Sequence, residues 1–167
     1  MKTLLLLRHA KSSWDRPDQS DHDRPLNSRG KHDAPRMGRL MRQEDIVPDL
    51  IVSSTARRAI DTANAAAEAC GYEQDSVQAT RRLYHAGVEE YIEVLRDLGE
   101  GPGMVMAVGH NPGIAEMVEA LTDEFARMPT AALAQIELPI NAWSELREDT
   151  GGKLAGYWEP RNVGPMI

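Results

Sequence analysis

Short apolar runs alternate along this chain with longer stretches in which apolar side chains recur every three or four positions. The short runs, bounded by charged or turn-forming residues, predict strands. The longer stretches have the spacing of one buried helix face and predict helices. We expect strands at residues 4–7, 50–52, 77–80, 104–108, 133–138 and 154–158. We expect helices at residues 30–42, 56–69, 88–98 and 112–121.

Capping chemistry marks the ends of the predicted helices. Ser28 precedes the first helix, and residues 53–55 (Ser-Ser-Thr) offer N-cap side chains for the second. Gly71 follows the second helix and suits a left-handed stop. Cys70 is the chain's single cysteine and is expected to be a small buried filler in the same alanine-rich stretch.

The alternation of strand and helix indicates an α/β sandwich with a mostly parallel sheet. A chain of 167 residues suits one domain spanning residues 1–167, and we find neither a low-complexity linker nor an internal repeat. Hydrophobic residues make up 41% and charged residues 27%, as in an ordinary soluble globular protein.

Charge and hydropathy narrow the functional classes. The net charge of -7 argues against a nucleic-acid-binding surface, which needs basic patches, but it allows a small phosphate pocket with a few local cations. The apolar run at residues 4–7 is too short for a signal-peptide core or a membrane span. We therefore expect a cytoplasmic protein that binds neither nucleic acid nor a membrane.

Candidate catalytic groups follow three of the predicted strands. Arg8 and His9 follow the first strand, Arg58 follows the second, and His110 follows the strand at residues 104–108. Ligands bind at the carboxyl edge of open α/β sheets. If these strands are parallel and adjacent, two imidazoles and two guanidinium groups surround one small cavity.

This set of side chains suits phosphoryl transfer. The planar fork of arginine donates two parallel hydrogen bonds to a phosphoryl group. A neutral imidazole with a free lone pair can attack phosphorus, provided its other nitrogen donates to a backbone or carboxylate oxygen. Arginines and a protonated second imidazole would stabilise the transition-state charge, and water would then hydrolyse the phosphohistidine. No metal or other cofactor is required.

Four motifs, in order along the chain, resemble the histidine phosphatase superfamily with its phosphoglycerate mutase-like fold. They also resemble its small branch, typified by the bacterial phosphohistidine phosphatase SixA. The motifs are residues 7–10 (Leu-Arg-His-Ala), 24–30 (Arg-Pro-Leu-Asn-Ser-Arg-Gly), 53–62 (Ser-Ser-Thr-Ala-Arg-Arg-Ala-Ile-Asp-Thr) and 108–112 (Val-Gly-His-Asn-Pro). The resemblance implies a three-layer α/β/α sandwich, with a six-stranded, mostly parallel sheet and helices on both faces.

The resemblance also implies roles for individual residues. His9 would be the phosphorylated nucleophile, and Arg8, Arg58 and His110 would complete the phosphate pocket. Arg58, not Arg57, occupies the family's register. Thr62 is expected to be a helix-packing hydroxyl rather than a ligand.

Two residues after His9 are added as substrate contacts. Lys11 replaces the glutamate of mutase-type relatives, which brings a cation to the mouth of the site and points away from mutase chemistry. Ser12 is expected to bind substrate beside Lys11. Ala10 replaces the usual glycine, which is tolerable if the position does not need positive φ.

The general acid is left open between two alternatives. His85 stands where mutase-type relatives carry a proton-donating glutamate, and its reference pKa near neutrality suits that role. Alternatively no dedicated acid exists, because the leaving nitrogen of a phosphoramidate such as phosphohistidine is easily protonated.

Other polar residues are expected to have structural or solvated roles. Residues 21–23 (Asp-His-Asp) are interpreted as a polar loop rather than a metal site, with His22 solvated like His32. Arg24 is expected to tie this loop down, and Trp14 to pack against it.

Three functions remain open from the sequence. Little spare chain is available for a lid, so an open site would admit a phosphorylated side chain on a protein surface, as in a phosphohistidine phosphatase. The second alternative is hydrolysis of small phosphate esters or pyrophosphate metabolites. The third is a non-catalytic phosphate-binding module, which is disfavoured because all four pocket residues are present.

Overall fold

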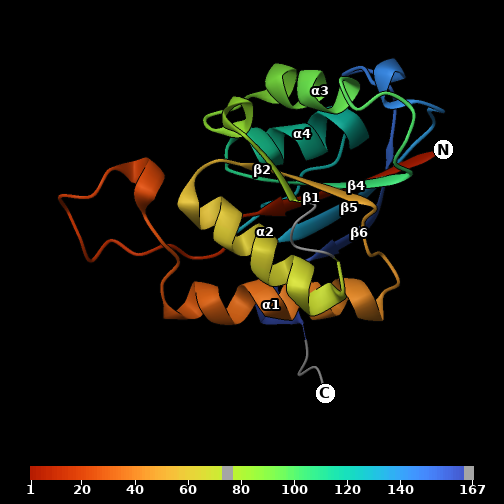
Figure 1. The fold of residues 1–167 in the computed structure, drawn as a ribbon. Coiled ribbons are helices and arrows are strands. Elements are labelled where there is room, and N and C mark those ends of the chain that lie inside the picture. Colours follow the sequence, from red (N-terminus) through yellow and green to blue (C-terminus); the bar gives the residue numbers. More distant parts are fainter. Residues whose placement is uncertain (73–76, 164–167) are drawn as a thin grey trace.

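The computed structural model describes residues 1–72 and 77–163. Its centre is a six-stranded sheet with the strand order β3-β2-β4-β1-β5-β6 (Figure 1). The strands are β1 (Lys2–Arg8), β2 (Leu50–Ser54), β3 (Val77–Thr80), β4 (Met104–Gly109), β5 (Leu133–Leu138) and β6 (Lys153–Trp158). The α-helices are α1 (Ser28–Gln43), α2 (Arg57–Cys70), α3 (Val88–Arg96) and α4 (Gly113–Thr122).

Most of the strand pairs are parallel. Strands β3, β2, β4 and β1 run in one direction, and β5 pairs antiparallel with both β1 and β6. This arrangement confirms the expected six-stranded, mostly parallel sheet. Because β4 lies between β1 and β2, the carboxyl ends of these three strands are neighbours at one edge of the sheet.

The helices cover both faces of the sheet, which confirms the three-layer α/β/α sandwich (Figure 1). Leu4 and Leu6 of β1 pack into the core beneath α3 and α4, whereas Leu5 and Leu7 pack into the core beneath α1 and α2. All four leucines are fully buried. An unbroken apolar run is expected for such a strand, because a central strand with helices on both sides has no face open to water.

The element boundaries differ from the predictions mainly at the helix starts. Helix α1 begins at Ser28 itself, and Asn27 is the N-cap that accepts a hydrogen bond from the Gly30 N–H at 2.9 Å. The expected Ser-Ser-Thr N-cap of α2 is wrong, because Ser53 and Ser54 extend β2 and the N-cap is Ala56.

The other ends agree more closely. Gly71 does end α2 with a φ of 88°, and Cys70 is buried as expected. Helix α3 ends at Arg96, two residues before the predicted end. Within the described part of the chain, no helix combines the length and apolar character that crossing a membrane needs.

Candidate active site

The predicted site residues come together at the carboxyl ends of β1, β2 and β4. Arg8 of β1 pairs in register with Gly109 of β4, which places His9 and His110 directly beyond the two strand ends. Their ring centroids are 5.1 Å apart. Gly109 is needed here because a side chain at this position would collide with the buried Tyr91 hydroxyl, which accepts a hydrogen bond from the His110 N–H at 3.3 Å.

A cavity of about 330 Å³ lies over these strand ends. It contains every residue that the sequence assigned to the site, namely Arg8, His9, Lys11, Ser12, Arg58, His85 and His110. It also contains residues that the sequence did not assign to it: Trp14, Asp21, Arg24, Asn111 and Thr130. The volume is within the range of small-molecule sites in proteins, which begins at about 300 Å³.

His9 is held as a neutral ring with one nitrogen free. Its Nδ1 is 2.8 Å from the carbonyl oxygen of Ala10. A carbonyl only accepts, so Nδ1 carries the proton and Nε2 keeps its lone pair. Burial, followed by the nearby positive groups of the site, lowers the pKa of His9 to about 3. The ring is therefore uncharged at neutral pH, as an attacking imidazole must be.

The backbone beneath His9 is tied to helix α2. The Ala10 N–H donates to Thr62 Oγ1 at 2.9 Å, and the Thr62 hydroxyl donates to the Arg58 carbonyl at 2.7 Å. Thr62 is fully buried, which agrees with the expected packing role and adds a direct link between the His9 loop and the helix that carries Arg58. Ala10 is not among the residues with positive φ. Its methyl group is therefore compatible with this position.

His110 is also a neutral ring at neutral pH. Its Nε2 lies 2.8 Å from Ser54 Oγ, and its Nδ1 faces Arg58 Nη2 at 3.5 Å. Arginine only donates, so Nδ1 is the unprotonated nitrogen. Burial, and then the Arg58 charge, lower the pKa of His110 to about 4. The protonated second imidazole expected around a phosphoryl group in the transition state stays a prediction.

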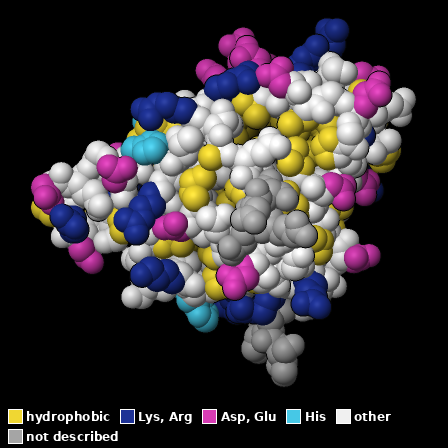
Figure 2. All heavy atoms as spheres, in the orientation of Figure 1, with side chains coloured by type: hydrophobic (Ala, Val, Ile, Leu, Met, Phe, Trp, Pro, Cys, Tyr) yellow, Lys and Arg dark blue, Asp and Glu magenta, His cyan; other side chains and the backbone are white. Residues whose placement is uncertain are grey.

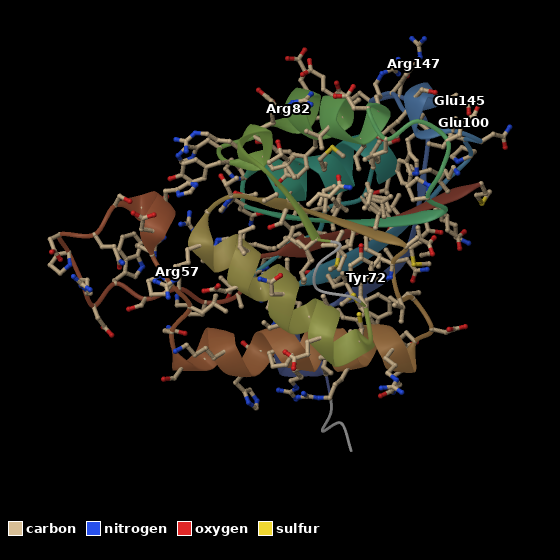
Figure 3. The ribbon with its side chains drawn as sticks, viewed as in Figure 1. Arg57, Tyr72, Arg82, Glu100, Glu145 and Arg147 are labelled. Atoms are coloured by element: carbon tan, nitrogen blue, oxygen red, sulfur yellow. The ribbon has the colours of Figure 1, made fainter. Side chains whose placement is uncertain are left out.

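The two adjacent arginines at the start of α2 have different surroundings. Arg58 is 5% exposed and lies in the cavity. Arg57 is exposed at the start of α2 and lies 3.6 Å from Asp61 (Figure 3). The predicted choice of Arg58 over Arg57 as the cavity residue agrees with this placement.

The side chains of Arg8 and Arg58 are only partly hydrogen-bonded. Arg8 Nη1 donates to the Met128 carbonyl at 3.2 Å, but the buried Nε atoms of Arg8 and Arg58 have no hydrogen-bond partner within residues 1–72 and 77–163. Burial, and then the Arg58 charge, lower the pKa of Arg8. Buried donors of this kind require an explanation. An oxyanion between the two guanidinium groups would balance their charge.

Asp21 lines the cavity, and the sequence analysis did not assign it to the site. It opens the short 3-10 helix η1 (Asp21–Asp23), and its Oδ2 lies 3.0 Å from Arg58 Nη2 and accepts a hydrogen bond from the Tyr84 hydroxyl at 2.6 Å. Its Oδ1 lies 3.1 Å from Arg24. The sequence offered one local signal for Asp21, its position three residues before Arg24. That spacing suggests an ion pair with Arg24 but does not reveal the contact with Arg58.

Residues 21–23 form this short 3-10 helix instead of the expected polar loop, and both aspartates are exposed. The expectation that His22 is solvated is wrong, because its side chain is half-buried. His22 Nε2 lies 2.8 Å from Thr55 Oγ1, and its ring meets Tyr84 edge-on with centroids 4.8 Å apart. The short helix is thus fastened to the start of α2 through His22 as well as Asp21. His32 is exposed, as expected.

Arg24 organises the loop that leads from β1 to α1. It is 7% exposed, donates to Ser12 Oγ at 2.6 Å, and places its guanidinium carbon 3.5 Å from the ring centroid of Trp14. This confirms that Arg24 ties the loop down. Trp14 packs against this guanidinium, which agrees with the expected packing against the loop, although the residue is 72% exposed.

His85 lines the cavity from a different segment. It has a positive φ of 61° and an exposed side chain, and its ring lies 4.0 Å from that of Tyr84. The structure therefore places His85 at the cavity wall, next to the tyrosine that donates to Asp21.

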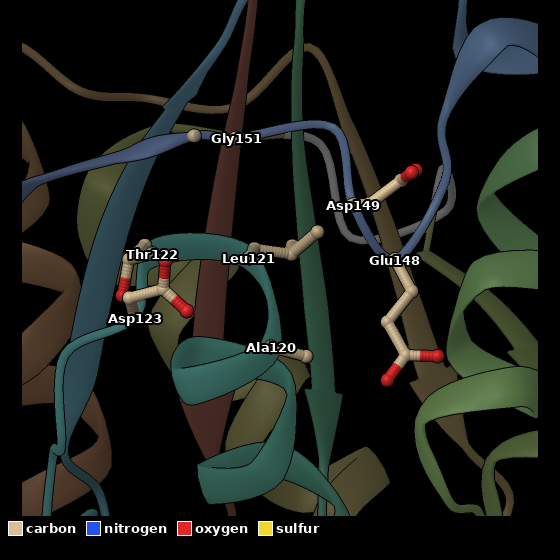
Figure 4. Close-up of a pocket in the computed structure, with 8 residues that line it drawn as sticks. Ala120, Leu121, Thr122, Asp123, Glu148, Asp149 and Gly151 are labelled. Carbon is tan, nitrogen blue, oxygen red and sulfur yellow. The ribbon is translucent and has the colours of Figure 1, made fainter.

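A larger cavity of about 580 Å³ lies at the other end of α4 (Figure 4). Its acidic side chains are Asp123, Glu148 and Asp149, so it does not suit a phosphate. On the face drawn in Figure 2, lysine and arginine alternate with aspartate and glutamate, and no broad basic patch is visible there.

Comparisons with known proteins agree with this geometry. The family model described as "Histidine phosphatase superfamily (branch 1)" matches residues 4–90. An uncharacterized chloroplastic protein of Arabidopsis thaliana is 30% identical over 170 residues, covering 95% of this chain and 78% of that protein. An uncharacterized protein of Mycobacterium leprae is 30% identical over 156 residues, covering 92% and 90%.

The 2,3-bisphosphoglycerate-dependent phosphoglycerate mutase of Bifidobacterium longum is 39% identical over 82 residues, but the match spans only 33% of that enzyme. Among solved structures, the protein assigned as phosphohistidine phosphatase SixA of Agrobacterium tumefaciens superimposes with a TM-score of 0.80 at 29% identity, covering 95% of this chain and 98% of that one. The chain therefore belongs to the histidine phosphatase superfamily.

Proposed function

We propose that this protein is a phosphatase that works through a covalent phosphohistidine on His9, and that its substrate is a protein phosphorylated on histidine or on another side chain. The observation that carries the proposal is the state of the His9 ring. It is neutral, it is oriented by the Ala10 carbonyl, and its free Nε2 belongs to a cavity lined by two arginines and a second histidine.

The first step transfers the phosphoryl group to His9. The His9 Nε2 lone pair forms a bond to phosphorus while the bond from phosphorus to the leaving atom breaks, and the leaving group takes up a proton. Arg8 and Arg58 balance the charge spread over the phosphoryl oxygens. A bound dianion also favours the protonated form of His110, which then donates from Nδ1.

The second step returns His9 to its neutral form. A water molecule attacks phosphorus, its protons pass to phosphate and solvent, and the P–N bond breaks with its electron pair returning to Nε2. The Nδ1 bond to Ala10 holds the ring in place throughout. The guanidinium groups supply the positive charge, so we expect activity to survive a strong chelator.

Whether the first step needs a general acid depends on whether the leaving atom is oxygen or nitrogen. His85 lines the cavity and can protonate a leaving oxygen. A leaving imidazole nitrogen needs less help, because it is readily protonated by solvent. Both alternatives from the sequence stay open, and the lack of a glutamate at position 85 favours a phosphoramidate substrate. The likeness to two structures assigned as SixA, at 28% and 29% identity, supports the same substrate class.

A second candidate is hydrolysis of small phosphate esters or pyrophosphate metabolites. The match to a phosphoglycerate mutase over 82 residues favours it, as does a cavity of about 330 Å³ that accommodates a small molecule. The segment after β2 is short, however, so little chain is available to close over a metabolite.

The test uses His9→Ala beside the unmodified protein. We expect the unmodified protein to turn over phosphate esters and to retain an acid-labile phosphoryl group after rapid quenching, whereas the folded His9→Ala variant does neither. Near-normal turnover by the variant would refute the nucleophile. Comparing kcat/KM for a phosphohistidine protein, a phosphoserine peptide and small metabolites decides between the two substrate classes.

A further inference from the structure

The carboxylate of Asp21 occupies a position that is at odds with a simple anion-binding site. It lies in the same cavity as His9 and His110, and it is in ion-pair contact with Arg58, the arginine proposed to hold the phosphoryl group. A second negative charge beside a phosphoryl site weakens anion binding. Its presence therefore needs a reason other than phosphate affinity.

The position of Asp21 is held from several directions. Arg58 binds it twice, through the carboxylate at 3.0 Å and through the backbone carbonyl, to which Nη1 donates at 2.7 Å. Arg24 and Tyr84 add bonds at 3.1 Å and 2.6 Å. Because these partners come from three separate segments of the chain, the carboxylate is a fixed part of the cavity wall.

Asp21 is ionised over the whole physiological range and cannot serve as a general acid. Partial burial acts to raise its pKa, but the hydrogen bonds from Tyr84, Arg58 and Arg24 outweigh this and hold the pKa well below its usual range. Its side chain is 42% exposed, so it presents a negative charge to whatever enters the cavity.

Asp21 also lies beside the segment that faces the leaving group. Its partner Tyr84 stacks on His85, with ring centroids 4.0 Å apart, and His85 is the proposed contact for the leaving atom. Lys11 contributes a positive charge to the same cavity, and solvent and salt screen both Lys11 and Asp21 because both are exposed. Asp21, however, is fixed at the wall by hydrogen bonds from Arg58 and Tyr84. The wall around Tyr84 is therefore the one where fixed negative charge meets the leaving group.

We propose that Asp21 is a specificity-determining residue that favours phosphoryl donors with a neutral or cationic nitrogen leaving group and disfavours donors with a second negative charge beside the phosphoryl group. This inference rests on the proposed function. The carboxylate stabilises the N–H of a departing imidazole or imidazolium and repels the second phosphate of a pyrophosphate. It thereby directs the site toward phosphohistidine and away from small polyanionic metabolites.

The alternative explanation is that Asp21 serves only to position Arg58. That role predicts a different result, because a displaced Arg58 weakens the binding of every anion alike. The ratio of affinities for two anions of different charge therefore separates the two roles.

The first experiment measures binding without turnover. In a His9→Ala background, inorganic phosphate and pyrophosphate are titrated calorimetrically into proteins with Asp21, Asp21→Asn or Asp23→Asn. Asp23 is the matched control, because it lies on the same 3-10 helix, is exposed, and contacts only His22 at 3.6 Å among the ion pairs of the described chain. Asp21→Ser replaces the asparagine variant if circular dichroism shows that the latter is unfolded.

We expect Asp21→Asn to shift the affinity ratio at least tenfold toward pyrophosphate, and Asp23→Asn to leave it within twofold. An unchanged ratio, or an equal loss for both anions, overturns the inference. The binding measurement can be read even if the protein turns over no substrate, so a failure of the proposed function is distinguished from a failure of this inference.

The second experiment measures selectivity in turnover with His9 present. The ratio of kcat/KM for phosphoimidazole to that for pyrophosphate is compared between the unmodified protein and Asp21→Asn. We expect this ratio to fall at least tenfold in the variant. A parallel fall for both substrates would show that Asp21 only positions Arg58.

Discussion

The two ends of the sheet carry cavities of opposite character. The cavity at the carboxyl ends of β1, β2 and β4 measures about 330 Å³ and is lined by arginines and histidines. The cavity beyond the other end of α4 measures about 580 Å³ and is lined by Asp123, Glu148 and Asp149. The smaller cavity is the candidate site because its charge and its buried, neutral imidazoles suit phosphoryl transfer, whereas the larger one repels an anion.

The fold explains why the chemistry is at one end only. Parallel strands deliver their following loops to the same edge, so the residues after β1, β2 and β4 meet there. Helix α4 leads from the His110 end of β4 to the opposite edge, where the Gly152 N–H donates to the Leu121 carbonyl at 2.7 Å. The loop after α4 returns to the first edge, where Thr130 lines the candidate cavity. Cavity volume does not distinguish these edges, but charge and burial do.

Loss of Arg58 should have the largest effect on the phosphate-binding edge. We expect Arg58→Ala to lower kcat/KM for para-nitrophenyl phosphate on the order of 10²- to 10³-fold, because it removes a buried positive charge from the transition state. Arg57→Ala is the matched control, since Arg57 is exposed and its ion pair among the described residues is with Asp61 on its own helix. A greater loss for Arg57→Ala would show that the register of the motif is wrong.

Low pH should destabilise the protein through the two histidines at the phosphate-binding edge. His9 and His110 have pKa values lowered to about 3 and about 4 in the folded protein, against 6.5 in the unfolded chain. Below pH 6.5 the unfolded chain therefore binds more protons, and the free energy of unfolding falls as pH falls toward 4. The expected loss approaches roughly 1.4 kcal/mol per pH unit for each ring.

Urea unfolding between pH 7.5 and 4.5 measures this loss. His9→Gln should flatten the pH dependence, because it removes one of the two rings whose pKa is lowered. A free energy of unfolding that is constant from pH 7 to pH 5 would contradict the lowered pKa values.

Loss of the hydrogen bond between Ala10 and Thr62 should have a smaller effect than the changes above. Thr62→Val leaves the buried Ala10 N–H without its acceptor, which should cost about 1–3 kcal/mol of unfolding free energy and reduce kcat by loosening the His9 ring. Thr62→Ser keeps the hydroxyl and should retain most of both. Equal stability of the valine and serine variants would show that this hydrogen bond is unimportant.

Substitutions in the acidic cavity should leave catalysis nearly unchanged. Glu148 and Asp149 line this far cavity, and exposed charges separated by more than a Debye length are screened. We therefore expect Glu148→Gln and Asp149→Asn to change kcat/KM by less than about twofold. A larger change, measured at 0.15 M salt, would mean that the two edges are coupled.

Much of this arrangement was predictable from local patterns. The buried run of leucines in β1 and the helical spacing of α1 and α2 depend on periodicity, which the sequence displays directly. The choice of Arg58 over Arg57 agrees with the cavity because adjacent residues on a helix point in different directions. The N-cap of α2 was mispredicted because β2 extends through Ser53 and Ser54 by pairing with its neighbours, which capping preferences do not reveal.

The sequence by itself determined which strands are buried and which residues follow them, because both depend on near neighbours in the chain. Only the tertiary structure decided the protonation of His9 and the place of Asp21. The first depends on burial and on the Ala10 carbonyl, and the second on Tyr84, which is 63 residues away along the chain. Desolvation and long-range contacts exist only once the chain has folded, so no local pattern encodes them.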